Sequence, residues 1–291
     1  MALKPVLPMK NLSLLLLVGL LILIPISGCS QEEQKTITAF IGAASKPAMD
    51  EAAQAFTAKT GIQVYCNYGG SGSMLSQIEL SKSGDLYIPG SQDYIPKAER
   101  KGIVDSNAVK RIAYLIPVIA VQHGNPKNIK SLSDLAKPGI KVGIGNPEAV
   151  CLGLYAVEIL DYNHLLAGVS RNIVTHAESC EKTATLLSLK SVDAVIGWHV
   201  FHDWDPDNID VVYLGTEQLP RIAYIPGVLT TFTQDKDSAQ KFLDFLVSPQ
   251  GQEIFSKWGY ITTESEARKF APEAEIGGEY KLPETYKPPV E

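Results

Sequence analysis

The regular alternation of strand-like and helix-like segments is the feature of this 291-residue chain that most limits its fold. Strands are expected where β-branched and aromatic residues alternate with polar ones, and helices where apolar residues recur at helical spacing. In the first hundred residues the expected strands are 36–41, 62–68 and 85–88, and the expected helices are 47–60, 74–82 and 94–101. This order requires mostly parallel sheets covered by helices, with ligands at the carboxyl ends of the strands.

The middle of the chain repeats this order and indicates a second α/β unit. Its expected elements are strands at 141–144, 172–175 and 194–197 and helices at 152–161 and 181–189. Two similar segments, Arg111–Pro117 and Arg221–Pro226, flank the unit. We interpret them as paired strands where the chain crosses to a second lobe and returns, although two unrelated buried strands would also look alike.

The sequence therefore predicts two hinged α/β lobes. The first lobe is expected to contain residues 36–115 and 227–291, and the second residues 116–226.

The first thirty residues are a different kind of sequence. Lys4 and Lys10 precede an apolar stretch that is too short for a comfortable membrane span and is typical of a secretory signal. The stretch ends in Ile26-Ser27-Gly28-Cys29, which resembles the lipobox of bacterial lipoproteins. We expect a signal peptide at 1–28, lipidation of Cys29, a tether at 29–35, and a location on the periplasmic or extracellular face of the cell envelope.

The charge balance argues against nucleic acid as a partner. Lys and Arg total 26 against 32 Asp and Glu, a formal net charge of −6, whereas phosphate backbones are bound by clustered positive charge. Small polar residues instead stand at expected helix starts, Ser45 in one case and Ser71 among glycines in another. Helix starts offer unpaired N–H groups that hold anions without a cationic side chain, although both serines also suit ordinary N-caps.

Several short motifs resemble those of the molybdate-binding proteins of ABC transporters, in the same order and spacing between about residues 36 and 261. The motifs are Ala43-Ala44-Ser45, Tyr68-Gly69-Gly70-Ser71-Gly72-Ser73, Gln77-Ile78-Glu79, Gly84-Asp85-Leu86-Tyr87, Gly145-Asn146-Pro147-Glu148, Gly153-Leu154-Tyr155-Ala156 and Ser248-Pro249-Gln250-Gly251. The resemblance implies a type II periplasmic-binding-protein fold and capture of a tetrahedral oxyanion, molybdate or tungstate first. It also implies ABC permease and ATPase partners. We expect a monomer, bound to the membrane by its lipid, with no cofactor, no resident metal and no enzymatic activity.

The resemblance also assigns the anion's contacts. They are the hydroxyls of Ser45 and Ser71, the backbone N–H groups of Leu152 and Cys180, and a tyrosine position that Trp198 occupies here. Tryptophan donates through N–H only and is larger than tyrosine. Because this difference changes the size and the donors of the expected site, sulfate, phosphate and arsenate are competing ligands.

Cysteine and histidine residues support an alternative class, an extracytoplasmic metal or thiol-ligand sensor. Cys151 and Cys180 lie at two expected helix starts, where they form a disulfide, stay separate thiols or bind a soft metal or an arsenic species. His199 and His202 lead a polar cluster with Asp203, which is either a metal site or a solvated turn. A third class, a hydrolase with Ser71 as nucleophile, lacks a neighbouring base in the sequence.

Overall fold

The computed structural model describes residues 35–283 and residue 286. The expected signal peptide, the lipidation site Cys29 and the tether up to residue 34 lie outside the described residues. The described residues form one compact unit. Within the described part of the chain, no helix combines the length and apolar character needed to cross a membrane.

The first of two sheets is built on the N-terminal strands. It has six strands in the order β11-β10-β3-β1-β2, with β4 paired to β10. Its strands are β1 (Thr36–Gly42), β2 (Gln63–Gly69), β3 (Leu86–Ile88), β4 (Lys110–Leu115), β10 (Arg221–Leu229) and β11 (Glu275–Ile276). The first three strands are mutually parallel, as the helical connections between them require, and β10 runs antiparallel to β3.

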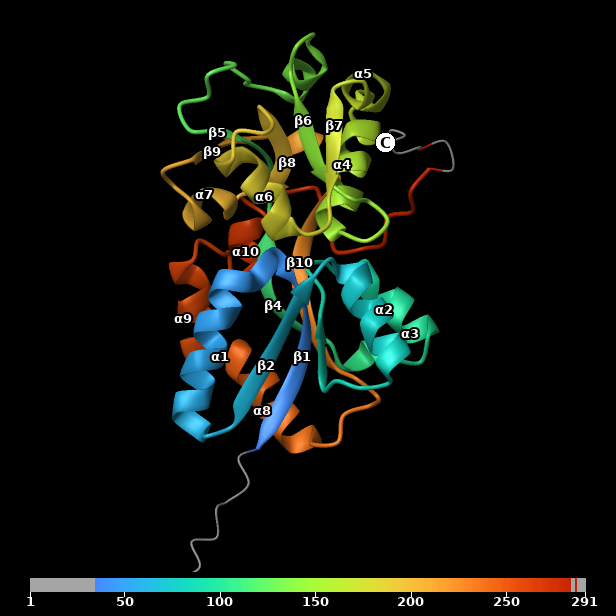
Figure 1. The fold of residues 1–291 in the computed structure, drawn as a ribbon, viewed down its shortest axis with the longest axis vertical. Coiled ribbons are helices and arrows are strands. Elements are labelled where there is room, and N and C mark those ends of the chain that lie inside the picture. The colour runs from blue at the N-terminus through green and yellow to red at the C-terminus, as the bar shows by residue number, and fades with distance from the viewer. Residues whose placement is uncertain (1–34, 284–285, 287–291) are drawn as a thin grey trace, which may run out of the picture. The chain divides into compact units, whose positions relative to one another are not determined.

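Helices cover both faces of this sheet. Figure 1 shows α1 and α9 on one side of it and α2 and α3 on the other. The bounds of the helices in this part are α1 (Lys46–Thr60), α2 (Ser71–Ser81), α3 (Tyr94–Arg100), α8 (Lys236–Leu246) and α9 (Pro249–Lys257). Most of these elements match the expected ranges within two residues. Helix α2 instead begins three residues early, with Gly70 as its N-cap, which places Ser71 in the first turn.

The second sheet has five strands in the order β7-β6-β8-β5-β9. Its strands are β5 (Pro117–Gln122), β6 (Val142–Gly145), β7 (Ile173–Ala177), β8 (Ala194–Trp198) and β9 (Ile209–Tyr213). Its helices are α4 (Cys151–Tyr162), α5 (Leu166–Ser170), α6 (Cys180–Ser188) and α7 (Phe201–Trp204). Strand β6 is parallel to β7 and β8, whereas β5 is antiparallel to β8 and β9, so both sheets are mixed.

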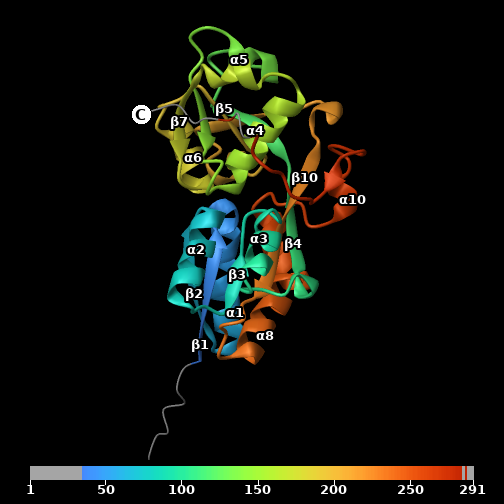
Figure 2. The same ribbon diagram turned by 90° about the vertical axis from the view of Figure 1, so that its right-hand side faces the viewer.

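The two similar segments of the sequence are paired strands, as we expected. Strands β4 and β10 are antiparallel, with Tyr114 opposite Tyr224 and Ala113 opposite Ile225. Strand β4 leads through Ile116 into β5 of the second sheet. Figure 2 shows β10 passing beside β4 where the two lobes meet. The two-lobed α/β fold is therefore confirmed, and hinge motion at this pair stays a prediction.

The C-terminal segment differs from the expected division into lobes. We expected all of residues 227–291 in the first lobe, but Ala267, Ala271 and Ala274 belong to the core of the second sheet. The Phe270 ring stacks on Tyr213 of β9 with 5.2 Å between the ring centroids. The segment is short and rich in alanine, so its sequence carries little periodicity from which to choose its lobe.

Three charged side chains are buried where the lobes meet. Arg221 at the start of β10 donates from Nε to Glu158 of α4 at 2.7 Å, and its NH2 group lies 3.0 Å from Asp93, the residue before α3. The side chains are 5% exposed for Arg221 and 0% for Asp93. Desolvated charges persist only when paired, so this ion triad of Asp93, Glu158 and Arg221 stabilises one arrangement of the lobes.

Candidate functional site

The two predicted serines lie beside one turn at the end of β1. The Ser45 hydroxyl is 3.4 Å from the carbonyl oxygen of Gly42, to which it donates. A Cβ atom added at Gly42 would lie 2.9 Å from Ser71 Oγ. Ser71 Oγ accepts the N–H of Gly90 at 3.0 Å, which leaves its own hydrogen free to point elsewhere. Both hydroxyls are buried, at the starts of α1 and α2.

The second lobe brings its predicted groups to the same place. The Cys151 sulfur contacts the Ser71 hydroxyl and lies 3.9 Å from the Cys180 sulfur. Around the Cys180 sulfur are the backbone N–H groups of Leu152 and Cys180 and the indole of Trp198. The structure therefore brings together the starts of α1, α2, α4 and α6, as the sequence predicted. We call Ser45, Ser71, Leu152, Cys180 and Trp198 the donor cluster.

The donor cluster favours negative charge at its centre. Burial acts to raise the pKa of Cys180, but the adjacent Cys151 thiol, the nearby Trp198 indole and main-chain N–H groups outweigh burial and lower it. Burial and the adjacent Cys180 sulfur raise the pKa of Cys151 well above its usual value.

Two polar groups beside the sulfurs are unsatisfied. No described residue gives the indole N–H of Trp198 or the hydroxyl of Tyr94 a hydrogen bond of ordinary geometry, and both atoms are buried. Burial raises the pKa of Tyr94, and the neighbouring Cys151, Asp93 and Cys180 raise it further. Buried polar groups normally have partners, so these two donors are available to a bound acceptor.

The lobes are closed over the donor cluster. The N–H of Gly72 in α2 donates to the carbonyl of Ala149 in the second lobe at 2.8 Å. A Cβ atom on Gly70 would lie 2.7 Å from the same carbonyl oxygen and 2.9 Å from that of Glu178. Glycine at position 70 therefore permits main-chain contact between the lobes.

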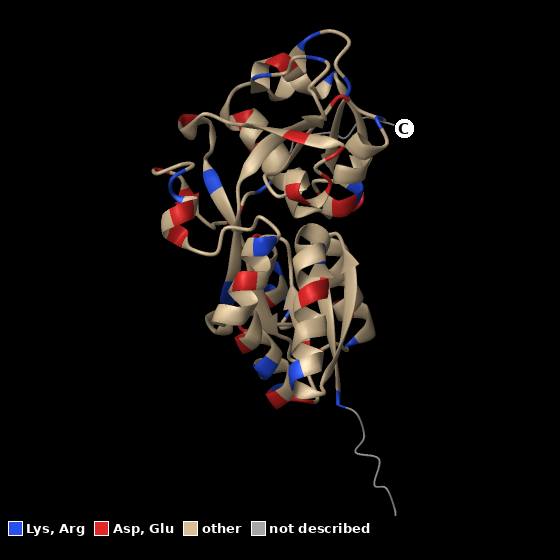
Figure 3. Ribbon diagram, turned by 90° about the vertical axis from the view of Figure 1, so that its left-hand side faces the viewer, with Lys and Arg blue, Asp and Glu red and all other residues tan. Residues whose placement is uncertain are grey.

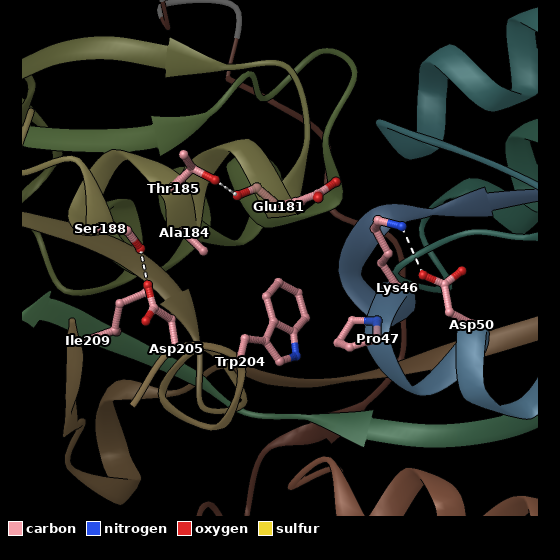
Figure 4. Close-up of a pocket in the computed structure, with 10 residues that line it drawn as sticks. All are labelled: Lys46, Pro47, Asp50, Glu181, Ala184, Thr185, Ser188, Trp204, Asp205 and Ile209. Carbon is pink, nitrogen blue, oxygen red and sulfur yellow. Dashed lines mark hydrogen bonds and ion pairs between the residues drawn. The ribbon is translucent and has the colours of Figure 1, made fainter. Parts of the chain in front are cut away.

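Two cavities border the closed site. One of about 410 Å³ is lined by Gly70 and Ser73 of the first lobe and by Ala149 and Ser179 of the second. The other, of about 270 Å³, lies between the start of α1 and helices α6 and α7 (Figure 4), and Trp204 and Pro47 face it. Neither cavity is lined by a member of the donor cluster, but Lys46, Gly70 and Glu181, which adjoin Ser45, Ser71 and Cys180 in the sequence, line one or both of them.

Two cationic side chains that line the neighbouring cavities are paired with carboxylates close to them in the sequence. Lys46 pairs with Asp50 at 2.9 Å, which is visible in Figure 4, and Lys182 pairs with Glu178. In the view of Figure 3, basic and acidic residues are interspersed over both lobes. Attraction for an anion therefore arises from N–H and O–H groups at helix starts.

The cysteines and histidines occupy different kinds of environment. The structure has Cys151 and Cys180 as free thiols in contact, so no disulfide joins them here. His199 accepts the N–H of Ile116 and donates to the carbonyl of Gly259, each at 3.1 Å, and burial lowers its pKa to about 4.

The polar cluster after Trp198 is a structural turn. His202 contacts the main chain of Ile209 at 2.7 Å, and Asp205 bonds Ser188 and Asn208. The described residues contain no group of three or more His, Cys, Asp or Glu that could hold a metal ion. The geometry thus gives no support to the metal-sensor hypothesis.

Sequence reasoning missed three residues that shape the site. Gly90 follows β3, and a Cβ atom there would lie 2.7 Å from Cys151 Sγ. Tyr260 donates its hydroxyl to the Ala44 carbonyl at 2.7 Å and so fixes the turn that carries Ser45. For Tyr94, the third of these residues, the sequence predicts only a place in the helix at 94–101. A glycine directly after a strand is a signal for close approach and could have identified Gly90.

Known proteins match this architecture over most of its length. The family model for bacterial extracellular solute-binding proteins matches residues 37–261. The molybdate-binding protein ModA of Escherichia coli is 23% identical over 243 residues, which cover 81% of this chain and 92% of that protein. The sulfate-binding protein of Escherichia coli is 23% identical over 230 residues, 70% of each chain.

A solved structure supports the fold directly. The sulfate-binding protein SubI of Mycobacterium tuberculosis superposes with a TM-score of 0.71 at 19% identity, covering 83% of this chain and 93% of that one.

Proposed function

The chain belongs to the family of bacterial extracellular solute-binding proteins, and on that premise we propose that it captures a tetrahedral oxyanion, molybdate or tungstate first, for an ABC transporter. The observation that carries this proposal is that the Ser71 hydroxyl, the Trp198 indole and main-chain N–H groups at the starts of α4 and α6 surround the adjacent, buried Cys151 and Cys180 sulfurs. Relatives named for molybdate and for sulfate both match at similar identity. Sulfate, phosphate and arsenate remain the competing ligands.

The mechanism follows from the position of the donors on both lobes. Ser45 and Ser71 belong to the first lobe, and Leu152, Cys180 and Trp198 belong to the second. An anion that accepts from both sets binds the closed form more tightly than the open one. Binding therefore shifts the population toward closure, and the permease and ATPase partners of the transporter would receive the closed, loaded protein.

The same proposal includes export and anchoring. A signal peptide at 1–28 would be removed and Cys29 would carry the lipid, so the mature protein would sit on the outer side of a membrane as a monomer. Catalysis is not part of the proposal, because the groups next to Ser71 Oγ are the Gly90 N–H and the Cys151 thiol, neither of which is an activated base.

Calorimetric titration of the reduced protein separates the candidate ligands. We expect 1:1 binding of molybdate and tungstate, with weaker binding of sulfate and phosphate, because the sequence motifs resemble those of molybdate-binding proteins. Titrations with Zn²⁺ and Ni²⁺ test the metal-sensor hypothesis. Tight metal binding without any oxyanion binding would refute the proposal, and so would turnover of a phosphate or carboxylate ester.

Closure itself is tested by the Gly70→Ala substitution. Gly70 has φ −63° and ψ 143°, which alanine adopts freely, so the added methyl group acts only against the Ala149 and Glu178 carbonyls of the other lobe. Overpacking of this kind costs about 1–3 kcal/mol, which corresponds to about a 5- to 150-fold loss of oxyanion affinity. The measurement is calorimetry, together with thermal unfolding to show that stability is kept.

Gly69→Ala is the matched control. Its new Cβ would meet the terminal methyl of Met74 at 2.7 Å, and a flexible side chain moves aside cheaply. Equal affinities for the two variants would show that contact between the lobes at Gly70 plays no part in binding.

A further inference from the structure

The sulfur atoms of Cys151 and Cys180 lie among the groups of the donor cluster. The Ser71 hydroxyl contacts the Cys151 sulfur, and the Leu152 N–H and the Trp198 indole contact the Cys180 sulfur. The two cysteines are 1% and 2% exposed. A tetrahedral oxyanion bound by these donors would therefore have to fit into the same space as two thiol groups. A ligand that forms covalent bonds to sulfur would instead bind to those thiols where they are.

The separation of the sulfurs suits one bridging atom. At 3.9 Å they are too far apart for a disulfide, whose S–S bond is about 2.05 Å. Two bonds of about 2.3 Å, the length of a zinc–thiolate bond, span this gap through a single central atom.

The surroundings of the sulfurs favour an oxyacid over a metal cation. The neighbouring groups are hydrogen-bond donors, which repel a cation and attract an oxygen atom. The indole N–H of Trp198, on a side chain with 0% exposure, and the hydroxyl of Tyr94 have no partner among the described residues. Nor do the described residues add a third His, Cys, Asp or Glu to the pair.

We propose that this buried pair of thiols binds a trivalent, thiophilic oxyacid such as arsenite, held covalently by Cys151 and Cys180. The inference rests on the proposed function, since the donor cluster that would bind a tetrahedral oxyanion also receives the oxygen of this ligand. Arsenous acid, As(OH)₃, condenses with the two thiols. Two As–S bonds form while two As–O and two S–H bonds break, each hydroxyl leaves as water with a thiol proton, and arsenic stays trivalent. The remaining As–OH oxygen accepts the N–H of Trp198, which has no hydrogen bond of ordinary geometry among the described residues.

The test is titration of the reduced, purified protein with sodium arsenite, followed by native mass spectrometry and Trp fluorescence. We expect one arsenic atom per chain and a fluorescence change at the buried indole. Two-point attachment gains about 10²- to 10⁴-fold over one point, so Cys151→Ser and Cys180→Ser should each weaken arsenite binding by at least about 100-fold.

Cys66→Ser is the matched control. Cys66 lies in β2, and burial raises its pKa to about 11; arsenite binding should be unchanged in this variant. Arsenite binding that survives in the Cys151→Ser, Cys180→Ser double variant overturns the inference, and so does Zn²⁺ binding through the same cysteines that is tighter than arsenite binding.

A parallel molybdate titration separates the two proposals. Molybdate binding without arsenite binding refutes the thiol site and leaves the proposed function intact. Arsenite binding that depends on both cysteines, without binding of any tetrahedral oxyanion, refutes the proposed function and supports the thiol site.

Discussion

Replacing Ser45 and Ser71 together by alanine is expected to lower oxyanion affinity by about 10²- to 10⁴-fold. Each hydroxyl is buried at a helix start and can donate one hydrogen bond to a charged ligand. Such a bond contributes about 1.5–3 kcal/mol, so two contribute about 3–6 kcal/mol. Calorimetry with the best-binding oxyanion measures the loss.

Ser73→Ala is the control for this experiment. Ser73 lies in the same first turn of α2 and is exposed, so its removal should leave affinity unchanged. Because Ser71 Oγ also accepts the Gly90 N–H, urea unfolding of each variant must show that the protein remains folded. A folded double variant that binds as tightly as the parent protein would refute the assignment of these serines.

Arg221→Met is expected to destabilise the protein by about 3–5 kcal/mol. The substitution removes the only cation of the ion triad and leaves the Asp93 and Glu158 carboxylates buried without it. It also removes the guanidinium that lies 4.6 Å from the centre of the Tyr155 ring. Urea unfolding at neutral pH measures the effect.

Arg111→Met is the matched control for Arg221→Met. Arg111 likewise pairs with a glutamate, Glu264, at 3.1 Å and lies 4.9 Å from the centre of the Tyr224 ring, but its side chain is 48% exposed. Exposed pairs contribute about 0–1 kcal/mol, so this variant should be nearly as stable as the parent protein. Similar losses in the free energy of unfolding for the two variants would show that burial does not increase the contribution of the ion triad to stability.

The destabilisation by Arg221→Met should depend on pH. Burial raises the pKa of Glu158, and the hydrogen bonds and charge of Arg221 oppose the rise. Without Arg221, the pKa in the folded variant rises further above its value in the unfolded chain. The folded variant then holds more protons than the unfolded chain, so its stability falls as pH rises through this window. The deficit should be smaller near pH 4 than at pH 7.

Local pattern was enough to predict most of the fold. Helix α1 ends at Gly61, which adopts φ 74° as a glycine after a helix does, and the repeated Arg-Ile-Ala-Tyr segments pair as β4 and β10. These elements follow from spacing, capping and β-propensity, which act over a few residues. The lobe that receives Ala267 and Ala271 was not predictable in this way, because a short alanine-rich segment packs equally well on many surfaces.

The sequence placed the candidate residues at helix starts but could not give the contacts between them. The sequence indicated Ser45, Ser71, Cys151 and Cys180 as residues at helix starts, and the structure brings these starts together. The contact between the two sulfurs, the closeness of Gly90 to Cys151 and the bond from Tyr260 to the Ala44 carbonyl depend on how the lobes pack. No pattern within one segment encodes such contacts.

By itself the sequence determined the order of strands and helices, the two crossing segments and the small polar residues that open the helices, because each depends on neighbours within a few positions. Only the tertiary structure decided that Arg221 pairs with both Asp93 and Glu158, and that two thiols and an indole meet at one buried point. Those arrangements join residues more than a hundred positions apart in some pairs, and they form only once both lobes are folded and in contact, because the attraction between the buried charges must then offset the cost of removing them from water.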